Sequence, residues 1–310
     1  MPKTFKKKSS AKRKISKRKR IIVILGLISL IAISVIIGYF LGQKENKALV
    51  KKDTTTKHSS HIIVKKKIVV EHKQVKIKKK SIKKSKKIKI KSFSGKPKLV
   101  IIIDDVHNKK QLDIIQKIDL KLTPSIFPPY SLSPRSHFLA RHLKHHMIHL
   151  PMESANNQLN SQDYTLMTTD SLQKIQLYIK KLHALFPNAK YINNHTGSVF
   201  TQNYIAMKNF YHILRKEGFM FIDSYTTKYS KVHKVAAEYG DEYVARNVFI
   251  DDEQKMSSIY KELQRAIQIA KKKGYAIAIG HPHAITMKAL NNAKTLLRDV
   301  DVVYIDEIYQ

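Results

Sequence analysis

The chain has 310 residues and contains no cysteine. This absence excludes disulfides, thiolate metal ligands and thiolate nucleophiles, and it is compatible with an oxidising compartment. The sequence also lacks a Walker loop, the GxGxxG and GxSxG patterns and an HExxH helix. These absences argue against nucleotide-binding loops, an α/β-hydrolase serine and the HExxH zinc proteases. Aromatic residues do not alternate with basic ones, so no surface for single-stranded nucleic acid is predicted.

The formal charge of +36 is distributed unevenly along the chain. Residues 1–20 carry 11 lysines and arginines and no acid, and residues 42–97 carry 20 lysines and 3 acids. Residues 98–310 carry 28 basic and 20 acidic residues, a net charge of only +8. The basic excess therefore belongs to the N-terminal segments and does not indicate specific nucleic-acid binding. The last 213 residues are enough for one domain with a full core.

Residues 21–41 contain no charged side chain. As a helix they would cover about 30 Å, the thickness of the hydrocarbon layer of a membrane. The KRKR block at 17–20 favours a cytoplasmic N-terminus and an exported C-terminal domain. A cleaved signal peptide is the alternative, but its apolar region is normally shorter and the following GQKENKALV is a poor cleavage site. We expect an uncleaved signal anchor in the inner (cytoplasmic) membrane, with residues 1–20 as a basic cytoplasmic tail.

Residues 42–97 form a lysine-rich linker by composition. Repulsion between lysines predicts that this segment is extended and largely disordered. One interpretation is a solvated spacer between the membrane and the C-terminal domain. The alternative is adhesion to an anionic polymer or lipid surface, which each lysine near the membrane would strengthen by about 1 kcal/mol.

Strand and helix patterns alternate from Lys98 to the C-terminus. Strands are predicted near 98–104, 123–127, 146–150, 190–194, 219–223, 243–250, 275–280 and 301–305. Helices are predicted near 109–117, 134–145, 170–186, 202–217, 231–239, 253–273 and 286–297. This alternation predicts a mainly parallel sheet, and apolar runs such as LVIII predict strands covered on both faces. Seven or eight such units in residues 98–310 favour an α/β fold built as a closed or distorted (β/α) barrel.

Several predicted strands end in polar side chains, and the carboxyl ends of parallel strands gather on one face of such a fold. Asp104 and Asp105 follow the run LVIII. Adjacent carboxylates at a strand end point to different sides, so one could bind a metal while the other serves as a base. A helix cap beside a solvated acid is the alternative. His149 and Glu153 are four residues apart, a spacing that places two zinc-ligand types on one side of a helical turn.

Three further strand ends carry candidate residues. The segment NNHTGS at 193–198 contains His195, which is either a functional residue or part of a capped turn. His281 emerges from the end of a buried strand, with His283 on the rim. Asp223 follows FMFI and either orients a histidine or caps the next segment.

The motifs IIIDD, HLPME, NNHTGS, FIDS and IGHPH, in this order, resemble the divergent polysaccharide deacetylase family. These bacterial envelope proteins are related to carbohydrate esterases of the NodB-homology type. The resemblance covers residues 98–310 and leaves out the anchor and the linker. It implies a distorted (β/α) barrel with a divalent metal, usually zinc, at the carboxyl face.

The resemblance also implies roles for individual residues. Asp104 would be the catalytic base and Asp105 a metal ligand. His149 matches the first histidine of a His-x-x-x-His ligand motif, with Glu153 at the second position as an alternate ligand. His195 is available as a replacement ligand.

The final histidine of the family's motifs, a general acid, resembles His281. Asn194, Ser198 and Asp223 lie within the matching motifs and are expected to bind substrate or support the ligands. The implied activity is metal-dependent deacetylation of an N-acetylated envelope polysaccharide such as peptidoglycan. A catalytically degenerate barrel that binds envelope glycan or a partner protein is the alternative. A lysine-driven binder of nucleic acid or membrane surface ranks last, because it would leave the strand-end motifs unexplained.

Overall fold

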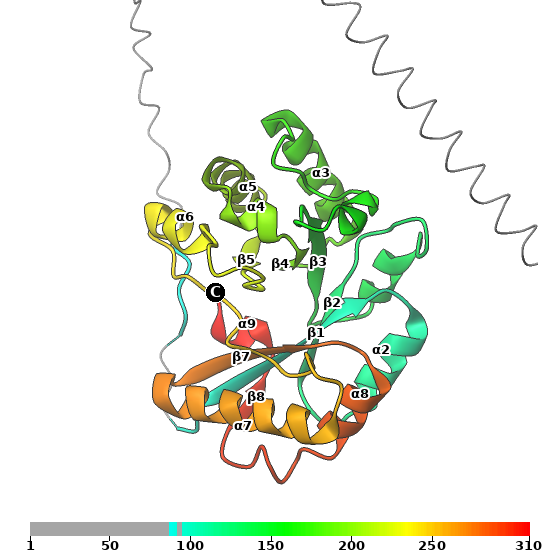
Figure 1. Cartoon of the computed structure of the whole chain (residues 1–310), viewed down its shortest axis with the longest axis vertical. Helices are drawn as coiled ribbons and strands as arrows, with labels where there is room; N and C mark the ends of the chain where they lie inside the picture. The colour runs from blue at the N-terminus through cyan, green and yellow to red at the C-terminus, as the bar shows by residue number, and fades with distance from the viewer. Residues whose placement is uncertain (1–86, 92–94) are drawn as a thin grey trace, which may run out of the picture. The chain divides into compact units, whose positions relative to one another are not determined.

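The computed structural model describes residues 87–91 and 95–310 (Figure 1). The basic tail at 1–20, the anchor predicted at 21–41 and most of the linker predicted at 42–97 lie outside the described residues. Within the described part of the chain, every helix is too short or too polar to traverse a bilayer.

Eight parallel strands form one sheet in the order β5-β4-β3-β2-β1-β7-β6, and β8 lies off this path. Their bounds are β1 Lys98–Val106, β2 Leu122–Ile126, β3 Met147–Met152, β4 Tyr191–Thr196, β5 Met220–Ile222, β6 Val248–Phe249, β7 Tyr275–Gly280 and β8 Asp301–Val303. β7 pairs with one edge of β1. The other edge of β1 is shared by two strands, because β8 pairs with Lys98–Val100 and β2 pairs with β1 from Ile101 onward. The parallel α/β architecture predicted from the sequence is confirmed.

The sheet curves into a half-barrel, and its two outer edges approach each other beyond β5 and before β6. Asp223 forms a parallel bridge with Ala245. The Asp223 N–H donates to the Val244 carbonyl at 3.0 Å, and the Arg246 N–H donates to the Asp223 carbonyl at 2.9 Å. These bonds join the edges only at one level, so the barrel is distorted rather than regularly closed.

β1 is buried on both faces, which explains its unbroken apolar run. Leu99, Ile101 and Ile103 belong to the cluster that packs against the surrounding helices. Val100 and Ile102 belong to a second cluster on the inner side of the sheet. All five side chains are fully buried. Alternating residues of this strand therefore face the barrel interior and the helices.

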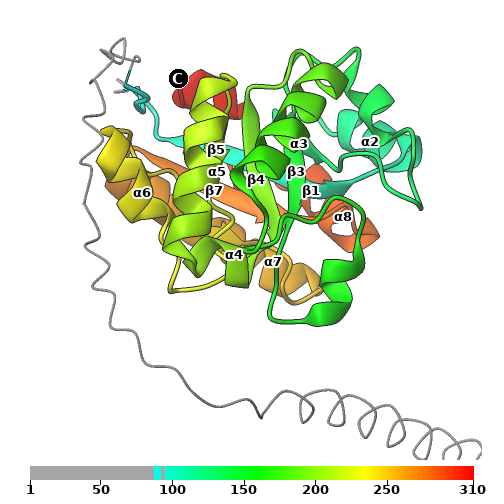
Figure 2. The same ribbon diagram turned by 90° about the horizontal axis from the view of Figure 1, so that it is seen from above.

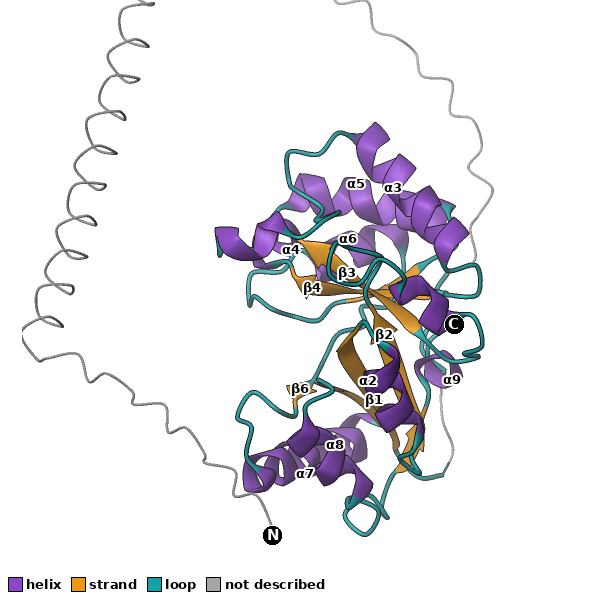
Figure 3. Ribbon diagram, turned by 90° about the vertical axis from the view of Figure 1, so that its right-hand side faces the viewer, coloured by secondary structure: helices purple, strands orange, loops and turns teal. Residues whose placement is uncertain are grey.

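The helices lie around the outside of the sheet, with α3 and α5 on one side and α7 and α8 on the opposite side (Figure 3). Their bounds are α2 Lys109–Gln116, α3 Leu172–Leu185, α4 Ser198–Gln202, α5 Tyr204–Lys216, α6 Val232–Tyr239, α7 Met256–Lys273, α8 Ala284–Asn291 and α9 Ile305–Ile308, with 3-10 turns at Ser136–Ala140 and Asn157–Ser161. The prediction of a helix at 134–145 was wrong. Only the 3-10 turn forms there, because Ser136 and Ala140 are its only buried residues and leave no apolar stripe for a longer helix.

Residues 87–91 pair with the C-terminus, although they fall within the linker predicted to be disordered. Ile90 bridges Tyr309 in antiparallel fashion, and Lys89 and Gln310 exchange two backbone hydrogen bonds. The side chains of Ile88 and Ile90 pack on the interior cluster. In Figure 2 this cyan segment lies near the C-terminus. Residues 87–91 of the predicted linker are thus part of the folded domain.

Candidate metal centre and catalytic site

Asp104 and Asp105 lie at the carboxyl end of β1, where the strand is irregular. Asp104 continues the inward-facing row of Val100 and Ile102 and is 2% exposed. Strand alternation would send Asp105 toward the helices. Instead, the register shifts between Ile103 and Val106, and Asp105 adopts the left-handed conformation with φ of 58°. Both carboxylates therefore serve the same mouth of the half-barrel, contrary to the prediction that they point to different sides.

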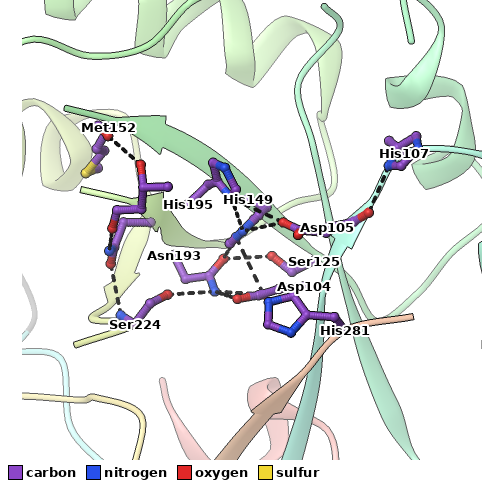
Figure 4. Close-up of polar contacts among 12 residues, drawn as sticks. Asp104, Asp105, His107, Ser125, His149, Met152, Asn193, His195, Ser224 and His281 are labelled. Atoms are coloured by element: carbon purple, nitrogen blue, oxygen red, sulfur yellow. Dashed lines mark hydrogen bonds and ion pairs between the residues drawn. The ribbon is translucent and has the colours of Figure 1, made fainter. Parts of the chain in front are cut away.

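Asp105, His149 and His195 converge at this mouth from strands β1, β3 and β4 (Figure 4). Asp105 Oδ1 lies 3.1 Å from His149 Nε2 and 3.2 Å from His195 Nδ1. The two imidazole nitrogens are themselves 3.2 Å apart. The three donor atoms thus form a nearly equilateral triangle. The ring of Phe127 packs edge-on against both imidazoles and restricts their orientation.

This triangle fits a divalent metal such as zinc. Zinc bonds of about 2.0–2.2 Å at near-tetrahedral angles place donor atoms about 3.2–3.6 Å apart. Asp105 Oδ1 is buried and makes no hydrogen bond of normal geometry within the described structure. Burial opposes ionisation of Asp105, but the two imidazoles outweigh it and hold its pKa well below its usual range. Three protein ligands leave a fourth position open, as in catalytic rather than structural zinc sites.

Asn193, a residue missed by the sequence analysis, orients His149. Its Nδ2 donates to both oxygens of Asp104 at 2.9 and 3.0 Å. Its Oδ1 accepts from Ser125 Oγ at 2.7 Å and lies 3.0 Å from His149 Nδ1. Because Oδ1 can only accept, this network assigns the proton to Nδ1 of His149. A neutral His149 then turns the lone pair of Nε2 toward the metal position.

Asp104 has the properties of a proton acceptor beside this centre. Its Oδ1 lies 3.5 Å from Nδ1 of His149. Burial raises the pKa of Asp104, and the neighbouring His149 and the hydrogen bond from Asn193 only partly offset this effect. A carboxylate whose pKa is raised takes up a proton more readily, which suits a general base.

His281 follows β7 and faces Asp104 from the other side of the mouth (Figure 4). Asp251 holds it twice, because one carboxylate oxygen lies 3.0 Å from its Nδ1 and the other accepts its backbone N–H at 2.7 Å. The second oxygen also accepts from Thr286 at 2.8 Å. Burial lowers the pKa of His281, but the Asp251 carboxylate outweighs burial and raises it to about 9. His281 is therefore a protonated imidazolium at neutral pH.

Glu153 does not join the metal cluster. The segment containing His149 is strand β3 rather than a helical turn, so the helical argument for pairing these two side chains was wrong. Glu153 lies just beyond β3, and its carboxylate accepts the Thr168 N–H at 2.6 Å. Its backbone N–H donates to the Leu166 carbonyl at 2.8 Å. This residue fixes the loop after β3.

The other predicted polar residues support loops around the mouth. Asn194 is buried, with Oδ1 accepting the Ser224 N–H at 2.9 Å and Nδ2 donating to the Thr196 carbonyl at 2.6 Å. Ser198 Oγ accepts the Ala155 N–H at 3.3 Å.

Asp223 accepts hydrogen bonds from the Tyr225 N–H, the Ser230 hydroxyl and the Tyr243 hydroxyl. It therefore holds the segment that follows β5, the second of the two roles considered for it. The acid that orients a histidine is Asp251. Like Asp223, it directly follows a predicted strand, the one at 243–250.

A groove of about 440 Å³ begins at Asp105 and runs along the loop after β2. Its lining combines the rings of Phe127 and Tyr130 with the amides of Gln158 and Gln162. Burial and the charge of Asp105 raise the pKa of Tyr130, so its hydroxyl remains protonated. Aromatic faces next to amide and hydroxyl donors offer both stacking and hydrogen bonding to a polar ligand.

The fold and the cluster together define a parallel α/β half-barrel with a candidate metal centre at the carboxyl ends of its strands. The family model described as divergent polysaccharide deacetylase matches residues 101–309. The chain belongs to this family, as its motifs predicted.

Similar proteins extend this comparison. The uncharacterised protein YibQ of Escherichia coli K12 is 32% identical over 198 residues, 62% of this chain and 61% of that protein. The chain thus spans about three fifths of the length of this relative. An uncharacterised protein of Haemophilus influenzae is 28% identical over 217 residues, 69% of this chain and 77% of that protein. A crystal structure of an uncharacterised Agrobacterium tumefaciens protein shares the fold, with a TM-score of 0.61, 19% identity and coverage of 70% and 92% of the two chains.

Proposed function

We propose that this protein is a metal-dependent deacetylase that removes acetyl groups from an N-acetylated envelope polysaccharide such as peptidoglycan. The observation that carries this proposal is the meeting of three metal-ligand side chains next to a buried carboxylate and an imidazolium. Asp105, His149 and His195 supply the ligands, Asp104 lies beside them, and His281 faces Asp104. Family membership supports the same reaction class.

Asp105, His149 and His195 would hold the divalent metal, with zinc favoured by two imidazoles and one carboxylate. When bound, such an ion polarises the amide carbonyl and makes water a better nucleophile at neutral pH. The protein's own contribution is orientation. The Asn193 network fixes His149 and Asp104 together, so the ligand and the base keep one relative position.

Hydrolysis of the amide then needs two proton transfers by this chain. Asp104 takes a proton from the attacking water, and its raised pKa favours this transfer. His281 gives a proton to the nitrogen as the C–N bond breaks, because Asp251 keeps it protonated. The products are acetate and a free amino sugar, with water supplying the added oxygen and hydrogens.

The groove beside Asp105 supports a sugar as the substrate. Tyr130 offers a partly exposed ring, while Gln158 and Gln162 offer amide groups that bond to hydroxyls. Pyranose rings carry apolar faces and polar edges, so this lining complements their surface.

Acetate release from N-acetylglucosamine oligomers by the full-length protein tests this function. We expect release that depends on added zinc and is lost in Asp104→Asn, a variant that keeps the shape of the side chain and removes its basicity. Absence of release at every zinc concentration from a folded protein would refute the activity. Saturable binding to purified sacculi without release would favour the glycan-binding alternative instead.

We also propose that residues 21–41 anchor the chain in the inner membrane with the domain outside the cytoplasm. The uncharged run after the KRKR block supports this topology. The lysine-rich linker would then lie near anionic lipid or polymer. Protease added to spheroplasts should digest the domain while residues 1–20 stay protected. Protection of the domain in intact spheroplasts, with digestion after lysis, would contradict this topology.

A further inference from the structure

Asp251, His281 and His283 form a second cluster of metal-ligand side chains near the mouth. One donor atom of each lies within 4.8 Å of the others. Asp251 is 4% exposed, His281 is half-buried and His283 is exposed on the rim. The rings of His281 and His283 are 5.7 Å apart. The cluster therefore combines the buried carboxylate of Asp251 with the solvent-exposed imidazole of His283.

Gly280 holds the two strand ends in this arrangement. A Cβ atom at this position would lie 2.7 Å from Ile250 Cγ1 and 3.4 Å from Asp251 Oδ2. The backbone of β7 thus approaches the end of β6 more closely than any other residue type would allow. This contact places Asp251 next to His281, so the carboxylate is already positioned before any cation arrives.

We propose that Asp251, His281 and His283 bind a second zinc ion, more weakly than the first site, and that this ion inhibits the enzyme. Two imidazoles and one carboxylate are the donor set of the first site as well. The second site is weaker because zinc must replace the hydrogen bond between Asp251 and Nδ1 of His281, and because the exposed His283 loses rotamer freedom. Binding releases the Nδ1 proton to solvent.

The inhibition rests on the proposed deacetylase function, whereas the binding does not. A zinc-bound neutral imidazole is a much weaker acid than an imidazolium. Once zinc occupies Nδ1, His281 cannot supply a proton readily to the departing amine. The first site, on the other side of Asp104, keeps its own three ligands.

Zinc binding by the full-length protein, kept in mild detergent, tests the site without any activity. Equilibrium dialysis followed by elemental analysis should find one tightly bound and one weakly bound zinc per chain. His283→Ala should weaken only the second ion, by more than about tenfold, and Asp105→Ala should weaken only the first. His142→Ala, which removes another exposed histidine, is the matched control and should leave both unchanged. A single zinc in the unmodified protein, or two unchanged zinc ions in His283→Ala, would overturn the proposal.

Acetate release at rising zinc concentration tests the inhibition. We expect release to rise as the first site fills, then fall as the second fills, and His283→Ala to keep its activity where the unmodified protein has lost it. Equal inhibition of both proteins would show that the second ion does not act through this site. If neither protein releases acetate while the dialysis finds two sites, the deacetylase function fails and the metal site stands.

Discussion

Replacement of Asp251 by asparagine tests how the site keeps its acid protonated. The Asp251 side chain is fully buried and lies 3.0 Å from Nδ1 of His281. Asparagine has nearly the same shape, and its one carbonyl oxygen can still accept a hydrogen bond from Nδ1–H, but it carries no charge. The substitution therefore removes the electrostatic support of the imidazolium, and it also places an NH2 group where the second Asp251 oxygen accepted the His281 N–H and the Thr286 hydroxyl.

The size of the effect follows from the two pKa values. His281 has a pKa of about 9 beside Asp251, although burial lowers it. Without the carboxylate, it should fall to about 6.5 or below, the ordinary value for histidine, which is a change of about 3 kcal/mol. At pH 7.5 the imidazolium fraction then falls from about 97% to about 9% or less. Turnover that needs this proton should fall about tenfold or more at this pH.

Two measurements on the full-length protein without excess zinc check this prediction. NMR titration of the His281 imidazole should give a midpoint near 9 in the unmodified protein and near 6.5 or below in Asp251→Asn. The basic limb of the pH profile of acetate release should move by the same amount. Thr286→Val, which removes one hydrogen bond to Asp251 but keeps its charge, is the matched control and should shift the midpoint little. A midpoint that stays near 9 in Asp251→Asn would show that the Asp251 carboxylate does not raise the pKa of His281.

Other perturbations test the stability of the fold. Because folding raises the pKa of His281, the pair with Asp251 stabilises the protein fully below about pH 6.5 and loses this effect as the pH rises through about 9. The Tm difference between the unmodified protein and Asp251→Asn should therefore shrink from pH 6 to pH 10, and a constant difference would contradict the linkage. Ile90→Asp should cost about 1–2 kcal/mol and lower Tm by about 2–8 °C, because a charge replaces a half-buried apolar side chain in the interior cluster. Lys89→Ala, its exposed neighbour, should leave Tm nearly unchanged, and equal effects of the two would show that residues 87–91 do not dock. Gly280→Ala should cost about 1–3 kcal/mol in urea unfolding because its methyl group has no room, and a neutral result would contradict the close contact at this strand end.

The strand ends were the part of the fold that the sequence predicted best. Apolar runs without alternation marked β1 and β7, and the polar residues after them mark the mouth. Parallel topology placed these strand ends on one face, and the resemblance to the family singled out Asp105, His149 and His195 among them. Such strands can be predicted because a strand that is buried on both faces is an uninterrupted run of apolar residues.

Other features depend on local geometry that periodicity does not encode. The left-handed conformation of Asp105 arises from a register shift within β1, and nothing in the letters DD distinguishes it from a regular strand end. The prediction that His149 and Glu153 share a helical turn failed because a spacing of four residues does not distinguish helix from strand. It places two side chains on one face of a helix, and it does the same in a strand, where every second residue faces the same side. Asn193 was passed over because its role depends on Asp104, which is 89 residues away. Ile90 docks through backbone pairing with Tyr309, a contact that a lysine-rich composition conceals.

The coordination of zinc in the full-length protein decides whether Asp105, His149 and His195 form a metal centre. X-ray absorption spectroscopy at one zinc equivalent should find two imidazole nitrogens and one carboxylate oxygen at about 2.0–2.2 Å, with one further light atom. The same spectrum for His195→Ala should lose one imidazole contribution. A protein that is folded yet binds no stoichiometric zinc, or that binds it without imidazole ligands, would contradict the assignment of Asp105, His149 and His195 as the metal centre.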